Sequence, residues 1–334
     1  MEWMELLNQL TRAFGPSGSE GGIRKTITDL IAPYVDEIKT DAMGNLIAHR
    51  KGEGKRLLFS AHMDSVGLLV THVEKEGWLR FHQLGGLTAQ DIRRQGVVFE
   101  NGTRGVIAVP EDKEEDRDLK RADLFIDVGA DSREEALKQV RPGDACVYTG
   151  TPFAQNGKVF SNYLDDRAGC AVLIEAARRI QNPQYDLYFL FSTQEEVGTR
   201  GVKPAAFGID PDIGIAVDVT GSDDLPGSDR WCSSVLGKGA GIKVMDGSVV
   251  CQPELVAWMS AVAEAAEIPV QQDILRSGGT DAGAIQVTRG GVWAGGIDIP
   301  CRYTHAPVEV CALSDLEAAA ALAARLAESG FDGR

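Results

Sequence analysis

Two changes of hydrophobic pattern, near residues 66 and 161, constrain the fold of this chain more than any other feature. Before the first change, helical patterns lead into RLLFSAH at 56–62, a continuous apolar run typical of a strand buried on both faces. The segment that follows has short strand-like stretches and two Asn-Gly hairpin signals, at 101–102 and 156–157. Beyond it the helical patterns and buried strands return. We therefore predict a discontinuous α/β domain, residues 1–65 and 161–334, that carries a β-rich insertion, residues 66–160.

Periodicity places the main elements of both parts. In the α/β part, helices are expected at 3–13, 20–34, 168–180, 253–267 and 313–330, and strands at 45–49, 56–62, 185–193, 213–220 and 291–300. In the insertion, a hairpin is expected after residue 66, a helix at 132–140, and an exposed loop at the charge run 111–118.

Composition excludes several classes of protein. A chain of 334 residues, 43% apolar and 25% charged, has ample material for two globular domains. Its net charge of −15 argues against a nucleic-acid partner, because phosphates would be repelled. Six widely spaced cysteines without a CxxC pair favour reduced core thiols over disulfides or a thiolate zinc site. Without a signal-peptide pattern or a bilayer-length apolar run, we expect a cytoplasmic protein with no membrane partner.

Acidic and histidine side chains recur where the apolar runs end. Ligands of an open α/β sheet gather at the carboxyl edge of its strands, so residues scattered along the chain can meet there. The candidates are His62, Asp165, Glu195, Glu196, Asp218 and His305.

Each candidate also has a structural interpretation. His62 and Asp64 could be a polar pair at a strand end, or a metal ligand with the carboxylate that supports it. Asp165 and Asp166 precede a predicted helix, so they could cap it or bridge two metal ions. Nothing in that pair indicates which acid faces the site.

The adjacent glutamates Glu195 and Glu196 are harder to explain structurally. Neighbouring residues at a strand end point in different directions, so one can bind a metal while the other transfers a proton. Asp218 lies among apolar residues and needs either a metal or a buried polar partner. His305 follows the last strand in a loop, where a structural role is equally open. Jointly the candidates supply the nitrogen and oxygen ligands that two zinc-like ions use.

Three further features have open interpretations. The glycine-rich turn 278–283 lacks the lysine of a phosphate loop, and it could approach a substrate or simply join a strand to a helix. Arg276 and Arg302 lie near these loops, so they could recognise acidic substrates or form structural ion pairs. The sequence does not assign the side-chain preference of a substrate pocket.

Six ordered motifs resemble one family over nearly the whole chain. The chain is similar to the cytosolic di-metal aminopeptidases, which include glutamyl, deblocking and tetrahedral aminopeptidases and some proteins with an endoglucanase name. The motifs are AHMDSVG, LDDRAG, QEEVGTRG, AVDVT, GGTDAGA and RYTHAPVEV.

This resemblance implies a fold and a set of roles. The fold would be a mixed central sheet flanked by helices, as in zinc peptidases, with a small inserted β-barrel-like domain for oligomerisation and substrate access. Two divalent ions, zinc or else cobalt or manganese, would be held by His62, Asp165, Glu196, Asp218 and His305. Asp165 would bridge them, Glu195 would be the general base, and Asp64 would support the site. Short peptides would be the substrate, and the chain would form a homododecamer.

Other functions use similar residues. A di-metal N-acyl amino acid deacylase or another amide hydrolase would need the same ligands. A glycosidase would use two carboxylates without a metal. The histidines beside the carboxylates and the 7% aromatic content, low for stacking against sugars, argue against this function. A non-catalytic protein of the same fold should have lost part of the ligand set.

Overall fold

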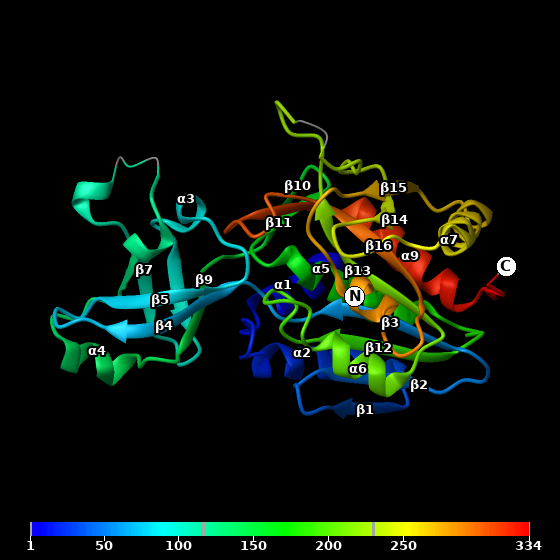
Figure 1. The fold of residues 1–334 in the computed structure, drawn as a ribbon, viewed down its shortest axis with the longest axis horizontal. Coiled ribbons are helices and arrows are strands. Elements are labelled where there is room, and N and C mark those ends of the chain that lie inside the picture. Colours follow the sequence, from blue (N-terminus) through cyan, green and yellow to red (C-terminus); the bar gives the residue numbers. More distant parts are fainter. Residues whose placement is uncertain (1, 115, 117, 229–230, 334) are drawn as a thin grey trace.

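The computed structural model describes residues 2–333 except 115, 117, 229 and 230. Figure 1 shows two parts side by side: an α/β part that contains both ends of the chain, and a smaller β part formed by the middle of the sequence. Among the described residues, no helix combines the length and apolar character needed to cross a lipid bilayer.

The α/β part is built on one large mixed sheet. Its strands are β1 (Glu37–Thr40), β2 (Leu46–Arg50), β3 (Arg56–His62), β10 (Phe153–Gln155), β11 (Lys158–Ser161), β12 (Asp186–Ser192), β13 (Ile213–Gly221), β14 (Ala240–Met245), β15 (Val270–Ile274), β16 (Trp293–Arg302) and β17 (Glu309–Ala312). They run in the order β1-β2-β12-β3-β13-β16-β17-β11-β10, with β14 and β15 joined through β16.

Helices cover both faces of this sheet. They are α1 (Trp3–Arg12), α2 (Gly21–Ile31), α5 (Leu164–Arg179), α6 (Val202–Ile209), α7 (Pro253–Ala265), α8 (Asp281–Gln286) and α9 (Leu313–Ala327). Side chains of β3 alternate between the two faces: Leu57 and Phe59 pack in the main core with α5 and α9, whereas Leu58 packs with α6 and α8. Burial on both faces explains the continuous apolar run in the sequence.

The inserted part is a closed six-stranded barrel in the order β4-β5-β8-β7-β6-β9. Its elements are β4 (Gly67–Val73), β5 (Leu79–Leu84), α3 (Ala89–Ile92), β6 (Gly96–Phe99), β7 (Arg104–Ala108), β8 (Phe125–Asp127), α4 (Arg133–Gln139) and β9 (Ala145–Tyr148). The predicted mixed sheet and the barrel-like insertion are confirmed. The domain boundaries stay a prediction: the barrel strands lie within 67–148, and β10 and β11 pair in the large sheet.

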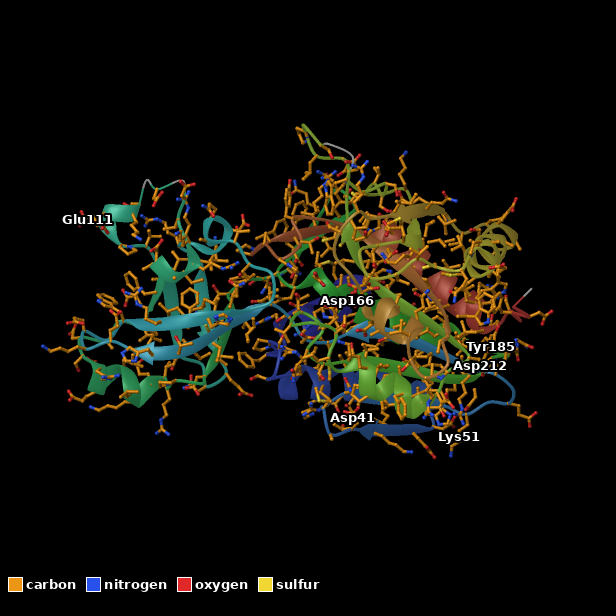
Figure 2. The ribbon with its side chains drawn as sticks, viewed as in Figure 1. Asp41, Lys51, Glu111, Asp166, Tyr185 and Asp212 are labelled. Carbon is orange, nitrogen blue, oxygen red and sulfur yellow. The ribbon has the colours of Figure 1, made fainter. Side chains whose placement is uncertain are left out.

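Both Asn-Gly turns join antiparallel strands, as predicted. Asn156 and Gly157 have φ values of 52° and 73°, the left-handed conformation that a two-residue hairpin requires. In the predicted loop 111–118, residues 111–113 form a short 3₁₀ turn at the tip of the barrel part, where Figure 2 labels Glu111. Glu115 and Arg117 of that prediction lie outside the described residues.

A buried cation stabilises the sheet beyond β13. Lys243 on β14 is fully buried, and its Nζ lies 3.0 Å from Asp273, 3.2 Å from Asp298 and 3.5 Å from Asp246. Three carboxylates in the core need this positive charge, because an unpaired buried charge is costly.

Candidate active site

Four parallel strands bring most of the candidate residues to one edge of the sheet. β12, β3, β13 and β16 are neighbours and run in the same direction, so their carboxyl ends lie together. His62 ends β3, Glu195 and Glu196 follow β12, Asp218 lies near the end of β13, and His305 follows β16. The expected gathering at the carboxyl edge is therefore what the structure shows.

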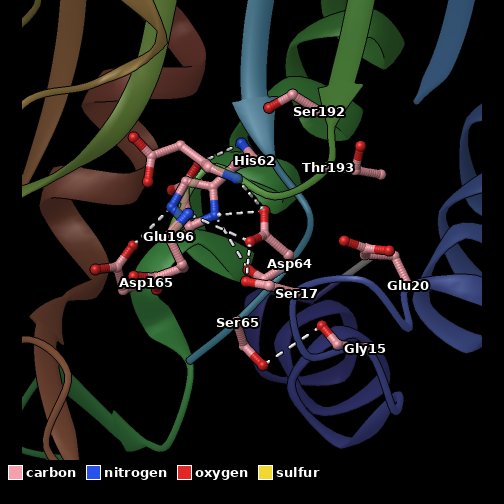
Figure 3. A network of polar contacts seen from close by, with 12 residues as sticks. Gly15, Ser17, Glu20, His62, Asp64, Ser65, Asp165, Ser192, Thr193 and Glu196 are labelled. Atoms are coloured by element: carbon pink, nitrogen blue, oxygen red, sulfur yellow. Dashed lines mark hydrogen bonds and ion pairs between the residues drawn. The ribbon is translucent and has the colours of Figure 1, made fainter. Parts of the chain in front are cut away.

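Asp165 lies at the centre of this group. Its Oδ1 is 2.9 Å from His62 Nε2 and its Oδ2 is 3.1 Å from His305 Nε2. His305 Nε2 is also 3.1 Å from Glu196 Oε2, and His62 Nε2 is 3.8 Å from Asp218 Oδ1. The five side chains thus form two halves that share Asp165, and the close-up in Figure 3 shows His62, Asp165 and Glu196 converging.

The structure distinguishes the two adjacent aspartates, which are joined by a cis peptide bond. Asp166 is fully buried and accepts hydrogen bonds from the backbone N–H groups of His62 at 3.2 Å and Gly169 at 2.8 Å. It therefore anchors the start of α5 against the end of β3, deep in the α/β part (Figure 2), while Asp165 faces both histidines. The bounds of helix α5 begin at Leu164, but Asp165 and Asp166 have non-helical backbone angles, so regular helix starts only after the two acids, close to the predicted residue 168.

Asp64 connects the strand ends behind His62. Its carboxylate accepts from the backbone N–H groups of Glu195 at 2.9 Å and Glu196 at 3.3 Å, and from the hydroxyl of Ser17 at 2.6 Å. The Nδ1 of His62 lies 3.1 Å from the carbonyl oxygen and 3.5 Å from the carboxylate of Asp64. Asp64 thereby sets the direction of the His62 ring and the path of the chain through both glutamates.

The second histidine is positioned by contacts from the barrel part and from β17. His305 Nδ1 lies 3.0 Å from the carbonyl oxygen of Gly86, and its backbone N–H donates to Glu309 at 2.7 Å. Glu309 also accepts the backbone N–H of Asp165 at 3.0 Å. The barrel part is thus directly involved in holding this ring.

The electrostatics of the cluster favour a cation. Burial, together with neighbouring carboxylates, raises the pKa values of Glu195, Glu196 and Asp218 above their usual range. Burial alone would lower the pKa of His62, but the carboxylates of Asp165, Asp64 and Asp218 raise it well above its usual value. Burial is the largest cause of the raised carboxyl pKa values, and the excess of neighbouring carboxylates accounts for the raised pKa of His62.

The donor set fits a metal in other respects too. Glu196 Oε1 is buried and has no hydrogen-bond partner among the described residues. His62, Asp165 and Glu196 each offer an atom within 4.8 Å of the others, and so do His62, Asp166 and Asp218. Imidazole nitrogen and carboxylate oxygen are ligands that divalent ions such as zinc accept.

A cavity of about 540 Å³ opens next to the cluster. His62, Asp165, Glu195, Glu196, Asp218 and His305 all line it. Glu195 is thus the one candidate that faces the cavity without lying within ion-pair distance of either histidine, as a proton-transferring group beside the ligands should.

Sequence reasoning missed three residues that hold the site. Ser17 and Glu309 contact ligand-bearing segments as described above, and Asp281 accepts from Ser60 at 2.5 Å and Ser192 at 2.7 Å beneath the strand ends. Glu309 stands alone in the apolar run PVEVCA, the same signal that drew attention to Asp218. No comparable signal marks Ser17, because its partner Asp64 lies 47 residues further along the chain.

The glycine-rich turn is a strand-to-helix connection, and its approach to a substrate stays a prediction. It joins β15 to α8, and Gly278, Gly279 and Thr280 line the cavity. Of the two arginines considered for acidic substrates, Arg302 forms a two-pronged ion pair with Asp224, its Nε lying 2.7 Å from Oδ1. Arg276 is exposed and does not line the cavity.

Comparisons with known proteins find one family, both in sequence and in structure. The family model described as M42 glutamyl aminopeptidase matches residues 44–322. A lysyl aminopeptidase of Pyrococcus furiosus is 37% identical, over 98% of this chain and 97% of that protein. The solved aminopeptidase APDkam598 of Desulfurococcus kamchatkensis has a TM-score of 0.94 and 35% identity, over 99% of this chain and 96% of that one. The TET1 peptidase of Pyrococcus horikoshii, which can assemble into a tetrahedron or a large octahedral shell, has a TM-score of 0.86 and 35% identity, over 98% and 99%.

Proposed function

This chain belongs to the M42 glutamyl aminopeptidase family, and from that premise we propose how its residues carry out metal-dependent removal of N-terminal residues from peptides. The observation that carries the proposal is the position of Asp165, with one carboxylate oxygen toward each of two histidines and Glu195 beside the same cavity. This arrangement supports the proposal of two metal positions and a separate base.

The residues divide between two divalent ions. His62 and Asp218 would hold one ion, His305 and Glu196 the other, and Asp165 would contribute an oxygen to each. Zinc is our first choice, with cobalt and manganese as alternatives, because the set contains nitrogen and oxygen donors and no thiolate. Such ions supply Lewis acidity, which makes water nucleophilic near neutral pH and polarises the scissile carbonyl.

The protein side of the reaction falls to Glu195 and Asp64. Glu195 takes the proton of the attacking water and passes it to the departing amine, which its place in the cavity allows. Asp64 holds the His62 ring and the backbone of residues 195–196 in position during this transfer. The acid-rich cluster also suits a free α-amine, which distinguishes an N-terminal residue from the rest of a peptide.

We also infer assembly and location. A solved relative forms tetrahedral or octahedral shells, and this chain aligns with 99% of it, so we propose self-association into a homododecamer in which the barrel domain participates. A light-scattering mass near twelve times the 35.9 kDa chain mass is expected, and a monomeric mass would contradict it. We place the protein in the cytoplasm, where its six buried cysteines would stay reduced.

The activity is tested with a panel of aminoacyl p-nitroanilides, after chelator treatment and after return of Zn²⁺, Co²⁺ or Mn²⁺. We expect release that the chelator abolishes and a metal restores. N-acetylated amino acids serve as the second panel. Cleavage of these alone, with two bound metals per chain, would replace the aminopeptidase by a deacylase.

A further inference from the structure

Part of the cavity lining consists of apolar and glycine residues that are not metal-ligand candidates. Val219, Trp231 and Leu275 form an apolar wall there, beside Gly221, Gly278 and Gly279. Apart from the ligand candidates and Glu195, every described residue that lines the cavity is uncharged. We call the part of the cavity that these apolar and glycine residues line the apolar end.

The apolar wall is held together by its own contacts. Cys232 pairs with Leu275 in an antiparallel bridge, and the backbone N–H of Arg276 donates to the carbonyl oxygen of Trp231 at 3.2 Å. The indole of Trp231 lies against the end of β13, since a Cβ built on Gly221 would be only 2.5 Å from its Cζ2 atom. Gly221 therefore provides the room that lets Trp231 form part of the wall.

Three charged residues that the structure describes near the apolar end have partners or point elsewhere. Arg302 is neutralised by Asp224, and Asp273, next to the wall in sequence, is buried against Lys243. Arg276 lies between two lining residues, but its side chain is exposed. A carboxylate or ammonium group that entered the apolar end would lose water and find no counter-ion among the described lining residues there, which is unfavourable.

We propose that the apolar end receives the side chain of the N-terminal residue of the substrate, and that it selects large uncharged side chains such as leucine, methionine and phenylalanine. This inference rests on the proposed aminopeptidase function. Such a side chain would gain by burying apolar surface against Trp231 and Leu275. The cavity volume of about 540 Å³ leaves space for it beside the reacting peptide bond.

The test compares kcat/KM for leucyl, phenylalanyl, alanyl, glutamyl and lysyl p-nitroanilides with the metal-loaded full chain. We expect the leucyl and phenylalanyl substrates to exceed the glutamyl and lysyl substrates by about tenfold or more. A preference for glutamyl or lysyl substrates would overturn the pocket assignment and leave the aminopeptidase function standing. Absence of hydrolysis for all five would overturn both.

Two variants test the wall itself. Gly221→Ala displaces the edge of the Trp231 ring that packs against Gly221, and Trp231→Ala removes the whole ring. Both should raise KM for the leucyl and phenylalanyl substrates about tenfold and leave the alanyl substrate nearly unchanged. Gly290→Ala is the matched control, because a Cβ there meets nothing within 4 Å. Equal losses on all substrates, or none, would contradict the proposal.

Discussion

The hydroxyl of Ser17 lies 2.6 Å from the carboxylate of Asp64, so a loop near the start of the chain supports the residue behind His62 (Figure 3). Asp64 in turn accepts the backbone N–H groups of both glutamates that follow β12. The N-terminal loop is thereby part of the support of the active site.

Ser17→Ala should weaken this support without removing a ligand. Contacts behind metal ligands typically contribute 10- to 100-fold in metal affinity or activity, so we expect zinc affinity to fall by about tenfold. Competition with a metal-sensitive dye measures the change. Ser19→Ala, in the same loop, is the control and should retain the original affinity. Equal affinities for both variants would show that Asp64 is positioned without Ser17.

Glu195→Gln should separate catalysis from metal binding. The amide keeps the shape of the side chain but cannot accept a proton from water, so kcat should fall by about 10²- to 10⁴-fold. Metal content, measured by mass spectrometry of the digested protein, should stay unchanged. Glu53→Gln, on an exposed loop, is the control. Retained turnover in the Glu195 variant would refute its role as base.

The two adjacent aspartates should respond differently to the same substitution. Asp165→Asn removes a charged oxygen that faces both histidines, so both ions should be lost and activity should disappear. Asp166→Asn should keep more of the metal and mainly lower the melting temperature, because Asp166 binds two backbone N–H groups. Metal analysis and thermal unfolding of both variants decide this, and full metal retention by Asp165→Asn would exclude the shared-ligand model.

Lys243→Met should destabilise the fold in a pH-dependent way. Loss of the cation leaves three buried carboxylates uncompensated, and removal of one partner of a buried ion pair typically costs about 3–5 kcal/mol. Burial already raises the pKa of Asp298 well above its usual value, and loss of Lys243 would raise it further. A group whose pKa is higher in the folded than in the unfolded chain contributes stability to the protein at low pH. That contribution is lost as the pH rises through the pKa of the group in the folded chain.

The deficit of Lys243→Met relative to the parent chain should therefore be larger at pH 7.5 than at pH 5.5. Urea unfolding of metal-free protein at the two pH values gives the comparison. Lys238→Met, at an exposed lysine, should unfold like the parent chain at both. A deficit that grows as the pH falls would contradict the assignment of buried charge.

The local pattern of apolar residues predicted the strands that are buried on both faces. The strands β3, β12, β13 and β16 have continuous apolar runs because helices cover both of their faces, and those runs also placed five of the candidate residues at strand ends. Two elements of the α/β part that break this rule were not predicted. The strand β14 contains Lys243, whose burial depends on carboxylates brought from other segments, and α6 contains Pro204 and Gly208, which oppose a helix in isolation.

Within the site, the sequence specified residue types better than directions. It could not show which of Asp165 and Asp166 faces the histidines, because that depends on how α5 starts beneath β3. The same limit applied to Arg302, whose partner Asp224 lies 78 residues earlier in the chain.

The carbonyl oxygen of Gly86 and the ring of His305 meet although 219 residues separate them. A chain made from its N-terminus has the barrel and most of the sheet available to fold long before His305 is synthesised. The proposed ligand set would close only after that last histidine reaches a scaffold that is already in place. A peptidase with this proposed site would therefore remain inactive until its synthesis is almost complete.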